Sequence, residues 1–188
     1  AMSDGGDVSK LSQGLGEVYE ILNMDMKPYP CCRSAHCAID GILEIREQME
    51  RRMGLQIQNK PEAEILVQQI SEIEIDTYLV GYKQCAVSDG CLHPKTILDA
   101  KFSTPYSVSA AFLYGTVGME QFESEVVFDP AVQNLLEKVT VRPLERFTEQ
   151  YPKHWGCHVK VIMQDGTAYE AEVEDPSGSV ARPLSRKQ

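Results

Sequence analysis

The sequence predicts an α+β fold, in which helices pack on an antiparallel sheet. Helical and strand periodicities follow one another irregularly, unlike the regular strand–helix alternation of a doubly wound sheet. A two-residue Asp165-Gly166 turn joins two runs of alternating apolar residues, which is typical of an antiparallel hairpin. With 188 residues, 43% hydrophobic and 24% charged, the chain has the size and composition of one globular domain.

The first expected elements are a helix and an extended stretch. Apolar residues recur at helical spacing over residues 7–22. Gly14 and Gly16 weaken this helix, so we expect it to lean on a neighbour. The prolines of Lys27-Pro28-Tyr29-Pro30 then impose an extended path.

The helix predicted over residues 35–53 has the strongest pattern. Ser34 is expected to cap it and Gly54 to end it. One face is apolar and is expected to pack on the sheet, while the charged face is expected to be solvated. The apolar face comprises Ile39, Ile42, Leu43, Met49 and Met53, and the charged face comprises Arg46, Glu47, Glu50 and Arg51.

The remaining elements follow from start signals and period-two runs. Pro61 opens a short helix, and Thr104-Pro105 and Asp129-Pro130 each combine a capping residue with a proline in the first helical turn. The glycines of residues 81–94 indicate a loop. The predicted strands are residues 73–79, 139–141, 157–163 and 167–173.

The charge balance excludes several classes of protein. Asp+Glu 28 against Lys+Arg 18 gives a net charge of −10, whereas nucleic acids and anionic membranes select for clustered Lys and Arg. No apolar run reaches the roughly 18 to 20 residues of a transmembrane helix, and the first residues lack the pattern of a secretory signal. We therefore expect a cytoplasmic protein that binds neither nucleic acid nor membrane.

The six cysteines are expected to be free thiols. Their spacing lacks the paired pattern of a structural zinc site. The alternatives to free thiols are a zinc site and redox chemistry. They are Cys31, Cys32, Cys37, Cys85, Cys91 and Cys157.

Reactive side chains are densest over residues 27–36. Lys27, Cys32, Arg33 and His36 lie where an extended segment meets a helix start, an arrangement suited to binding a carboxylate. A lysine near another cation, or partly desolvated, can also act as a general acid or base. The alternative is a pair of surface cations beside a structural histidine.

Other side chains carry weaker signals. Residues 101–106 place Lys101 and Ser103 at a second helix start, for which the alternative is simple capping by Thr104. Tyr78 is either a proton donor or a side chain packed at the sheet surface. The remaining histidines are interpreted as structural: His93, His154 and His158. No serine-hydrolase, nucleotide-binding or zincin motif is present in the sequence.

Together, these segments resemble the MmgE/PrpD family. Residues 27–36, followed by Ile39-Asp40, are similar to its K-P-Y-P-x-C-x-x-x-H-x-x-I-D signature. Residues 101–108 are similar to its second signature. Residues 129–139 and the ending with Asp175-Pro176-Ser177-Gly178 fit its C-terminal part.

The resemblance implies chemistry on small polycarboxylates without a metal or organic cofactor. Members of this family include 2-methylcitrate dehydratase, cis-aconitate decarboxylase and iminodisuccinate epimerase, and they pair a large helical domain with a smaller α+β domain around the active site. Residues 3–183 match the smaller domain. Ala1 and Met2 would be an expression remnant, and residues 184–188 a truncated tail leading to the missing helical domain, which carries the family's catalytic histidines and acidic residues.

The resemblance also implies roles for single residues. Lys27 matches the motif lysine and is the catalytic candidate. Position 32 holds cysteine in dehydratase-like members and histidine in decarboxylase-like members, which disfavours decarboxylation. Tyr78 lies near an active-site tyrosine of decarboxylase-like members. The substrate-binding candidates are His36, Arg33, Cys32, Tyr78, Lys101 and Ser103.

Two functions are therefore expected. The first is one wall of the active site of a lyase or isomerase that resembles 2-methylcitrate dehydratase. On its own such a wall is expected to be inactive and to self-associate, most simply as a homodimer. The alternative is a non-catalytic domain that binds an acid or a partner protein.

Overall fold

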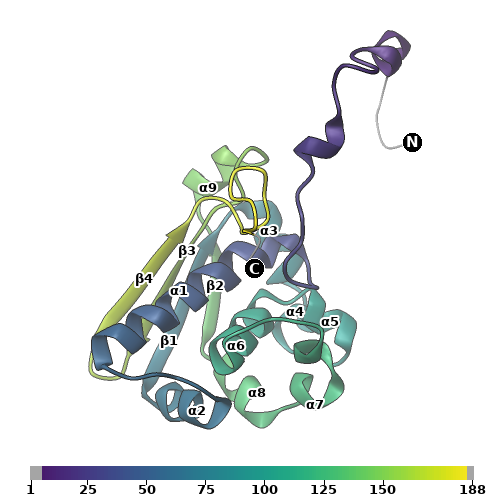
Figure 1. Cartoon of the computed structure of the whole chain (residues 1–188). Helices are drawn as coiled ribbons and strands as arrows, with labels where there is room; N and C mark the ends of the chain where they lie inside the picture. The colour runs from purple at the N-terminus through teal and green to yellow at the C-terminus, as the bar shows by residue number, and fades with distance from the viewer. Residues whose placement is uncertain (1–5, 186–188) are drawn as a thin grey trace.

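A four-stranded sheet lies beside a group of helices in this computed structural model, which describes residues 6–185 (Figure 1). The expected remnant at Ala1 and Met2 and the last three residues of the expected tail lie outside the described residues. The strand order is β2 (Val139–Pro143), β1 (Ile70–Thr77), β3 (Cys157–Met163) and β4 (Ala168–Val173). The predicted α+β class is confirmed.

The sheet is mixed and not wholly antiparallel. β3 pairs antiparallel to both β1 and β4, as the hairpin signal predicts. β2 pairs parallel to β1, which corrects the expectation of an antiparallel sheet. The chain between these two strands passes through several helices, and a helical crossover of that kind returns the chain to the same end of the sheet.

The longest helix, α1 (His36–Met53), covers the apolar face of the sheet. Ile39, Ile42 and Met49 are fully buried there, as predicted. Gly41 permits the close approach, because a Cβ at this position would lie 2.8 Å from Cγ2 of Val159 in β3. Gly54 ends the helix with a left-handed φ of 66°.

Three details of α1 correct the sequence-based expectations. Ser34 does not cap the helix, since the N-cap residue is Ala35 and the Ser34 side chain bonds elsewhere. Arg46 is buried and not solvated, because the chain after the helix folds back and its Ile57 carbonyl accepts a 2.6 Å hydrogen bond from Nη2. Met53 is 37% exposed.

The helices with proline start signals form as predicted: α2 (Lys60–Gln69), α6 (Thr104–Tyr114) and α8 (Pro130–Leu136). Ser103 caps α6 in place of Thr104, because its Oγ accepts from the Tyr106 amide at 3.0 Å. The shorter elements outside these helices are η3 (Arg33–Ala35), α5 (Ile97–Lys101), η4 (Glu120–Phe122), α7 (Ser124–Val127) and α9 (Glu145–Gln150). Across residues 6–185, no helix combines the length and apolar character needed to span a bilayer.

The predicted strand at residues 73–79 and the predicted loop at residues 81–94 both need correction. β1 ends at Thr77, and two short helices follow, α3 (Leu79–Cys85) and α4 (Asp89–Leu92). Ser88 caps α4, with its Oγ accepting from the Cys91 amide. The isolated cysteines in this stretch are buried contacts of helices and not loop residues.

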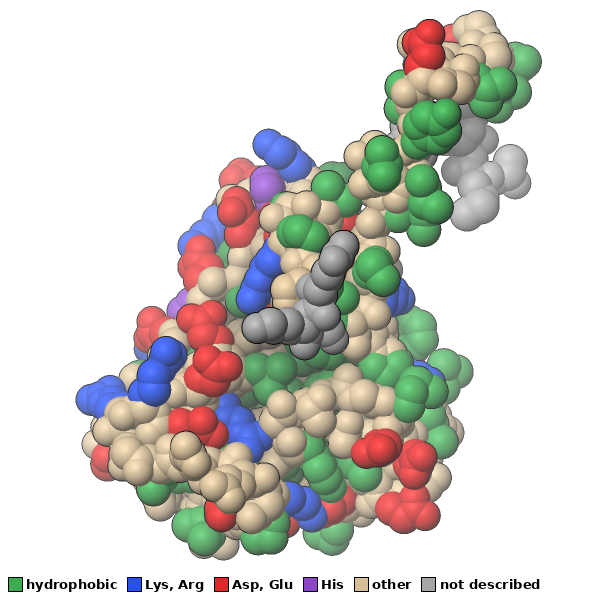
Figure 2. Space-filling model, in the orientation of Figure 1, with side chains coloured by type: hydrophobic (Ala, Val, Ile, Leu, Met, Phe, Trp, Pro, Cys, Tyr) green, Lys and Arg blue, Asp and Glu red, His purple; other side chains and the backbone are tan. Residues whose placement is uncertain are grey.

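The helix predicted over residues 7–22 does not form. Two short 3-10 turns, η1 (Val8–Ser12) and η2 (Glu20–Asn23), stand in its place and project from the domain as an arm (Figure 1). Gly14 and Gly16 adopt left-handed φ values of 73° and 85°, which interrupt a right-handed helix. The apolar side chains of this arm are exposed to solvent (Figure 2).

Candidate functional site

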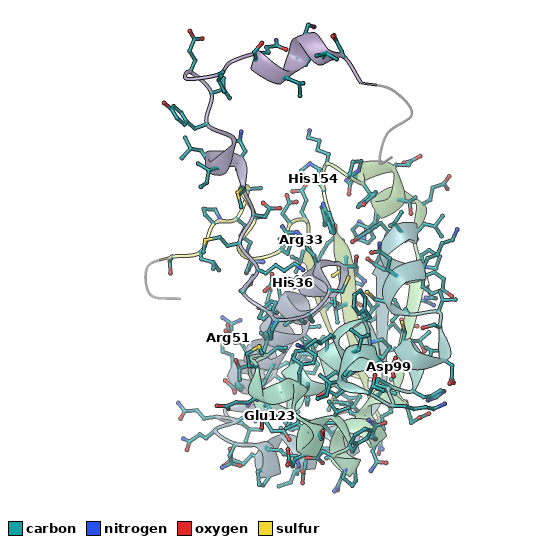
Figure 3. The ribbon with its side chains drawn as sticks, turned by 90° about the vertical axis from the view of Figure 1, so that its right-hand side faces the viewer. Arg33, His36, Arg51, Asp99, Glu123 and His154 are labelled. Carbon is teal, nitrogen blue, oxygen red and sulfur yellow. The ribbon has the colours of Figure 1, made fainter. Side chains whose placement is uncertain are left out.

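The first motif lies where the extended segment enters α1. In this segment the amide of Cys32 donates a 2.8 Å hydrogen bond to the carbonyl of Lys101. This backbone hydrogen bond connects the first motif, residues 27–36, to the second motif, residues 101–106. Lys27 is exposed, and its Nζ lies 3.5 Å from the Cys31 carbonyl oxygen. Figure 3 shows Arg33 and His36 together at the start of α1. The site is therefore a surface built from two chain segments.

A clamp holds the extended segment in place. We use this name for the contacts of Asp40 and residues 25–30 with residues 177–182. The buried carboxylate of Asp40 accepts from Tyr29 Oη at 2.6 Å, from the Ser177 amide at 2.6 Å and from Arg182 Nη1 at 3.2 Å. Two further backbone donors, the amides of residues 26 and 180, complete the clamp.

Gly178 makes the clamp geometrically possible. It has a φ of 82°, and a Cβ at this position would lie only 2.2 Å from the Met26 carbonyl oxygen. Its own carbonyl accepts a 2.7 Å hydrogen bond from the Met26 amide. A side chain at position 178 would force the two segments apart.

His36 is one of the fully buried members of the site. Its side chain has no solvent exposure, and neither ring nitrogen makes a well-formed hydrogen bond among the described residues, although the Cys31 backbone lies close enough to raise the pKa of the ring. The Tyr29 ring contacts it edge-on, with centroids 5.1 Å apart. Burial lowers the pKa of His36 to about 4, and the charges of Arg33 and Lys27 act in the same direction. The ring is therefore neutral at pH 7.

Arg33 is held between an aspartate and an aromatic ring. Its Nη2 forms a 2.7 Å ion pair with Asp25, and its guanidinium lies 5.4 Å from the centroid of the Trp155 ring. Nε and Nη1 are buried, and among the described residues they have no hydrogen-bond partner. Two of its donor groups thus remain available near His36.

Tyr78 is buried behind the first motif and not at the sheet surface. Its hydroxyl donates to Ser34 Oγ at 2.8 Å, and Ser34 donates in turn to Gln84 Oε1 at 2.9 Å. The Tyr78 ring stacks on Tyr151 with centroids 4.6 Å apart. Burial raises the pKa of the Tyr78 hydroxyl well above its ordinary value. Tyr78 therefore supports the start of α1 from beneath.

The two candidates of the second motif differ in their surroundings. Lys101 is half-buried, with Nζ 5.8 Å from the centroid of the Phe122 ring, and its charge reaches Cys31. Ser103 is fully buried, and its hydroxyl both caps α6 and donates to the Cys91 carbonyl. The structure thus brings Lys101 to the first motif and uses the Ser103 hydroxyl within the fold.

None of the six cysteines forms a disulfide among the described residues. The surroundings of these thiols differ, and their pKa values differ as a result. Burial raises the pKa of the Cys31 thiol to about 12. The Cys32 thiol has a pKa lowered to about 6, chiefly because the Cys85 thiol donates a hydrogen bond to its sulfur. The same hydrogen bond, with burial, raises the pKa of Cys85 far above its usual range.

One group outside the motifs has the composition of a metal site. Among the described residues, only His154, Glu174 and Asp175 place three ligand atoms within 4.8 Å of one another. His154 Nδ1 lies 2.8 Å from an Asp175 oxygen, so a hydrogen bond between these two side chains accounts for their approach. It shares no residue with the two motifs.

Comparison with known proteins decides the family. The family model described as MmgE/PrpD C-terminal domain matches residues 29–188. The chain belongs to the MmgE/PrpD family. A cis-aconitate decarboxylase-like protein of Aspergillus oryzae, oryM, is 26% identical over 173 residues, which cover 90% of this chain and 33% of that protein. The chain therefore spans about a third of the length of this relative.

Sequence reasoning missed two residues of this MmgE/PrpD site. Asp40 belongs to the quoted signature, yet its place in the clamp depends on Ser177 and Arg182, which lie more than 130 residues away. A buried acidic residue in the first turns of an apolar helix is the signal that could have found it. Asp25 carries no comparable signal, because it precedes the motif in an exposed stretch.

Proposed function

We propose that this domain forms one wall of the active site of a lyase or isomerase that acts on a small polycarboxylate, as 2-methylcitrate dehydratase does. The observation that carries the proposal is that four of the six buried polar atoms without a well-formed hydrogen bond among the described residues lie in the first motif, namely both ring nitrogens of His36 and Nε and Nη1 of Arg33. Buried polar groups in folded proteins nearly always have partners. A substrate with two or three carboxylates would supply several acceptors at once.

These atoms are covered by neighbouring side chains, so contact with a ligand requires a small movement. Tyr29 lies over His36, and Lys27 precedes it on the same extended segment. An outward shift of residues 27–30 would open the His36 ring and break the hydrogen bond from Tyr29 to Asp40, while Asp40 keeps its contacts with Ser177 and Arg182. The exposed Lys27 ammonium would meet the ligand first.

The chemistry assigned to this wall is stabilisation of negative charge. Removal of a proton beside a carboxylate, or loss of water or carbon dioxide, places additional charge on the substrate, and fixed cations and hydrogen-bond donors lower that barrier. Lys27 would bind a carboxylate or protonate an intermediate, and neutral His36 would orient a second group. Lys101 and Arg33 would contribute charge from the sides.

The resemblance at position 32 supports dehydration, whereas the named relative is a cis-aconitate decarboxylase-like protein. Cys32 matches dehydratase-like members, which favours elimination of water from a hydroxy acid such as 2-methylcitrate. Because the relative from Aspergillus oryzae is named a cis-aconitate decarboxylase-like protein, cis-aconitate is the second acid to test after 2-methylcitrate. Both are small polycarboxylates, so the proposed binding contacts are the same.

Binding is tested on the full chain by NMR titration with citrate, with acetate as the monocarboxylate control. We expect saturable shifts of the His36 ring signals with citrate alone, and their loss in Lys27→Met. Lys10→Met, which removes a lysine of the exposed arm, is the matched control and should bind as the unmodified chain does. Equal responses to citrate and acetate would contradict the proposal.

Catalysis is tested by mixing the chain with a separately produced helical domain of an MmgE/PrpD protein. Dehydration of 2-methylcitrate creates a carbon–carbon double bond that ultraviolet absorbance detects. We expect turnover that depends on both domains and falls at least a hundredfold in Lys27→Met. Turnover unchanged in this variant would remove Lys27 from the mechanism.

The second candidate function is a non-catalytic domain that binds an acid or a partner protein. The exposed apolar side chains of the arm favour it, because such surfaces mark interaction sites. Citrate binding without turnover in the mixing experiment would support this alternative.

A further inference from the structure

Three potential metal ligands meet at one end of the β3–β4 hairpin, outside the two motifs. Cys157 in β3 pairs with Val173 in β4, so the residues just before β3 and just after β4 lie side by side. His154 precedes β3, and Glu174 and Asp175 follow β4. Figure 3 shows His154 at the end of the domain from which the arm projects. The antiparallel register therefore brings a histidine and two carboxylates together.

The spacing of the three ligand atoms suits one metal ion. His154 Nδ1 lies 2.8 Å from an Asp175 oxygen and 3.7 Å from a Glu174 oxygen, and one ligand atom of each residue lies within 4.8 Å of the other two. Zinc binds nitrogen and carboxylate oxygen at about 2.0 to 2.2 Å, which places neighbouring ligands roughly 3.0 to 3.5 Å apart. Small side-chain rotations would therefore bring all three atoms to a single ion.

Two of the three side chains are already held in place. The side chains of His154 and Asp175 are 24% and 14% exposed, and the hydrogen bond between them fixes the orientation of the imidazole. The side chain of Glu174 is 67% exposed, so it can rotate toward an ion without disturbing the core. Little conformational freedom would therefore be lost when an ion binds.

The group opens into a cleft of about 480 Å³ whose charge favours a cation. Arg182 is the one lysine or arginine among the described residues that line the cleft, and its Nη1 is paired with Asp40 at 3.2 Å. Glu172 also lines the cleft and is paired with Arg146 at 2.6 Å. These pairs leave Glu44 and the two carboxylates of the group as the acidic side chains of the cleft. The cleft has room for an ion with several water molecules.

We propose that His154, Glu174 and Asp175 form a binding site for a divalent transition-metal ion of the zinc class. The ion would take the place of the proton between His154 Nδ1 and the Asp175 oxygen, and the neutral imidazole would carry its proton on Nε2. Water molecules from the cleft would complete the coordination. The imidazole nitrogen distinguishes this set from the acidic groups common on protein surfaces, because imidazole favours zinc over magnesium and calcium.

An ion at this site would stabilise the clamp. Asp175 lies two residues before Ser177, whose amide donates to Asp40, whereas His154 belongs to the loop before β3. Joining these two segments would restrain the chain that holds the first motif in place. The ion would act on stability and not on the proposed chemistry, because its ligands belong to neither motif.

The test is a calorimetric titration of the full chain with zinc chloride and, separately, with magnesium chloride. We expect saturable binding of one zinc ion per chain and no saturable binding of magnesium at the same concentrations. Zinc should also raise the melting temperature of the chain. Cobalt(II) replaces zinc for absorption spectroscopy, and the bound ion should show d–d bands without the intense charge-transfer band of a thiolate ligand.

Four variants locate the site. His154→Gln and Glu174→Gln should each weaken zinc binding at least about tenfold, and the exposure of Glu174 means that its variant should fold normally. His158→Gln is the matched histidine control, because the two ring nitrogens of His158 face different carboxylates and one ion cannot use both. Cys32→Ser, at the partly exposed cysteine, is the thiol control. Both control variants should bind zinc as the unmodified chain does.

Four outcomes would overturn the proposal. They are the absence of saturable zinc binding, unchanged binding in Glu174→Gln, loss of binding in Cys32→Ser, and equal binding of magnesium and zinc. None of these measurements uses citrate or turnover, so failure of the metal site would leave the proposed function standing.

Discussion

A fully buried histidine makes the stability of this domain depend on pH. The pKa of His36 is about 4 in the folded chain, against an ordinary value of 6.5. The unfolded chain therefore binds a proton between pH 6.5 and pH 4 that the folded chain does not. The contribution of His36 to stability is present in full above pH 6.5 and is lost as the pH falls through 4. Its size is about 3 kcal/mol.

This first prediction is checked by urea unfolding at a series of pH values. His36→Gln should remove about 3 kcal/mol of the fall in unfolding free energy between pH 6.5 and pH 4. A His36 ring that titrates near pH 6.5 by NMR would contradict the assigned burial.

The second prediction concerns the carboxylate at the centre of the clamp. Asp40→Asn keeps the size of the side chain but replaces one acceptor oxygen with a donor that faces the Ser177 amide and Arg182. We expect the free energy of unfolding to fall by about 2 to 3 kcal/mol. Chemical denaturation measures this loss, and Glu47→Gln, on the exposed side of the same helix, should change it by less than about 0.5 kcal/mol. Equal effects of the two substitutions would show that the clamp does not contribute to the free energy of unfolding.

Single residues were predictable from the sequence where their roles depend on near neighbours. Gly54 ends α1 and Asp129 caps α8 because both roles are set within one turn of the chain. Arg46 was not predictable, because it is buried by a segment that returns after the helix, and for Asp40 only its acidic character among apolar residues gave a signal, while its partners lie far away in the sequence. A charged residue on the polar side of a helical pattern gives no sign of such a return.

At the scale of elements, the contact between α1 and the sheet depends on one small residue. In Gly41→Ala, the new Cβ would lie 2.8 Å from a methyl group of Val159, so the helix would have to move away from β3. We expect a loss of about 1 to 3 kcal/mol in the free energy of unfolding. Gly118→Ala is the control, because the nearest atom to its Cβ would be 3.5 Å away. Thermal unfolding of the two variants compares them, and similar melting temperatures would contradict the close packing.

Elements with a sustained local period were the predictable ones. The helix α1 and the β3–β4 hairpin each carry their own pattern and turn signals, and both form as expected. The parallel pairing of β2 was not predictable from its short run, because it depends on the helical crossover that precedes it. The arm does not form the predicted helix because its apolar side chains have no surface to pack against within residues 6–185. Without that packing, nothing compensates for the two glycines with left-handed φ values.

At the scale of the whole molecule, the arm is the surface most suited to association. Leu11 and Leu15 are each 81% exposed, and Leu22 is 77% exposed. We predict that the full chain self-associates with rising concentration, most simply as a two-fold dimer. Light scattering should show that a chain beginning at Met24, which retains Asp25 and the clamp, remains monomeric.

Point substitutions refine this prediction. Leu11→Glu and Leu15→Glu should each weaken association, whereas Leu98→Glu, at a 65% exposed position on α5, should not. A shortened chain that associates as strongly as the full chain would assign the interface to the body of the domain.

The final prediction is that the chain alone is catalytically silent. One wall cannot position a substrate against both an acid and a base, and such positioning contributes roughly 7 to 11 kcal/mol of barrier lowering. A site open on one side also remains hydrated, which weakens the electrostatic effect of Lys27. Turnover of 2-methylcitrate or cis-aconitate above background by this chain, lost in Lys27→Ala but not in Lys10→Ala, would show that the domain holds a complete site.

The clamp also determines how the domain should respond to a pulling force. It joins the amide of Met26 to Gly178 and the amide of Val180 to Asp25, so the chain between them forms one long loop closed at its base. Tension applied to the two flanking segments would load these few hydrogen bonds first and separate them one after another. The strands would bear no force until the clamp had opened. In a pulling experiment the domain should therefore lengthen first by a small step at its base, and the sheet should rupture only later and at higher force.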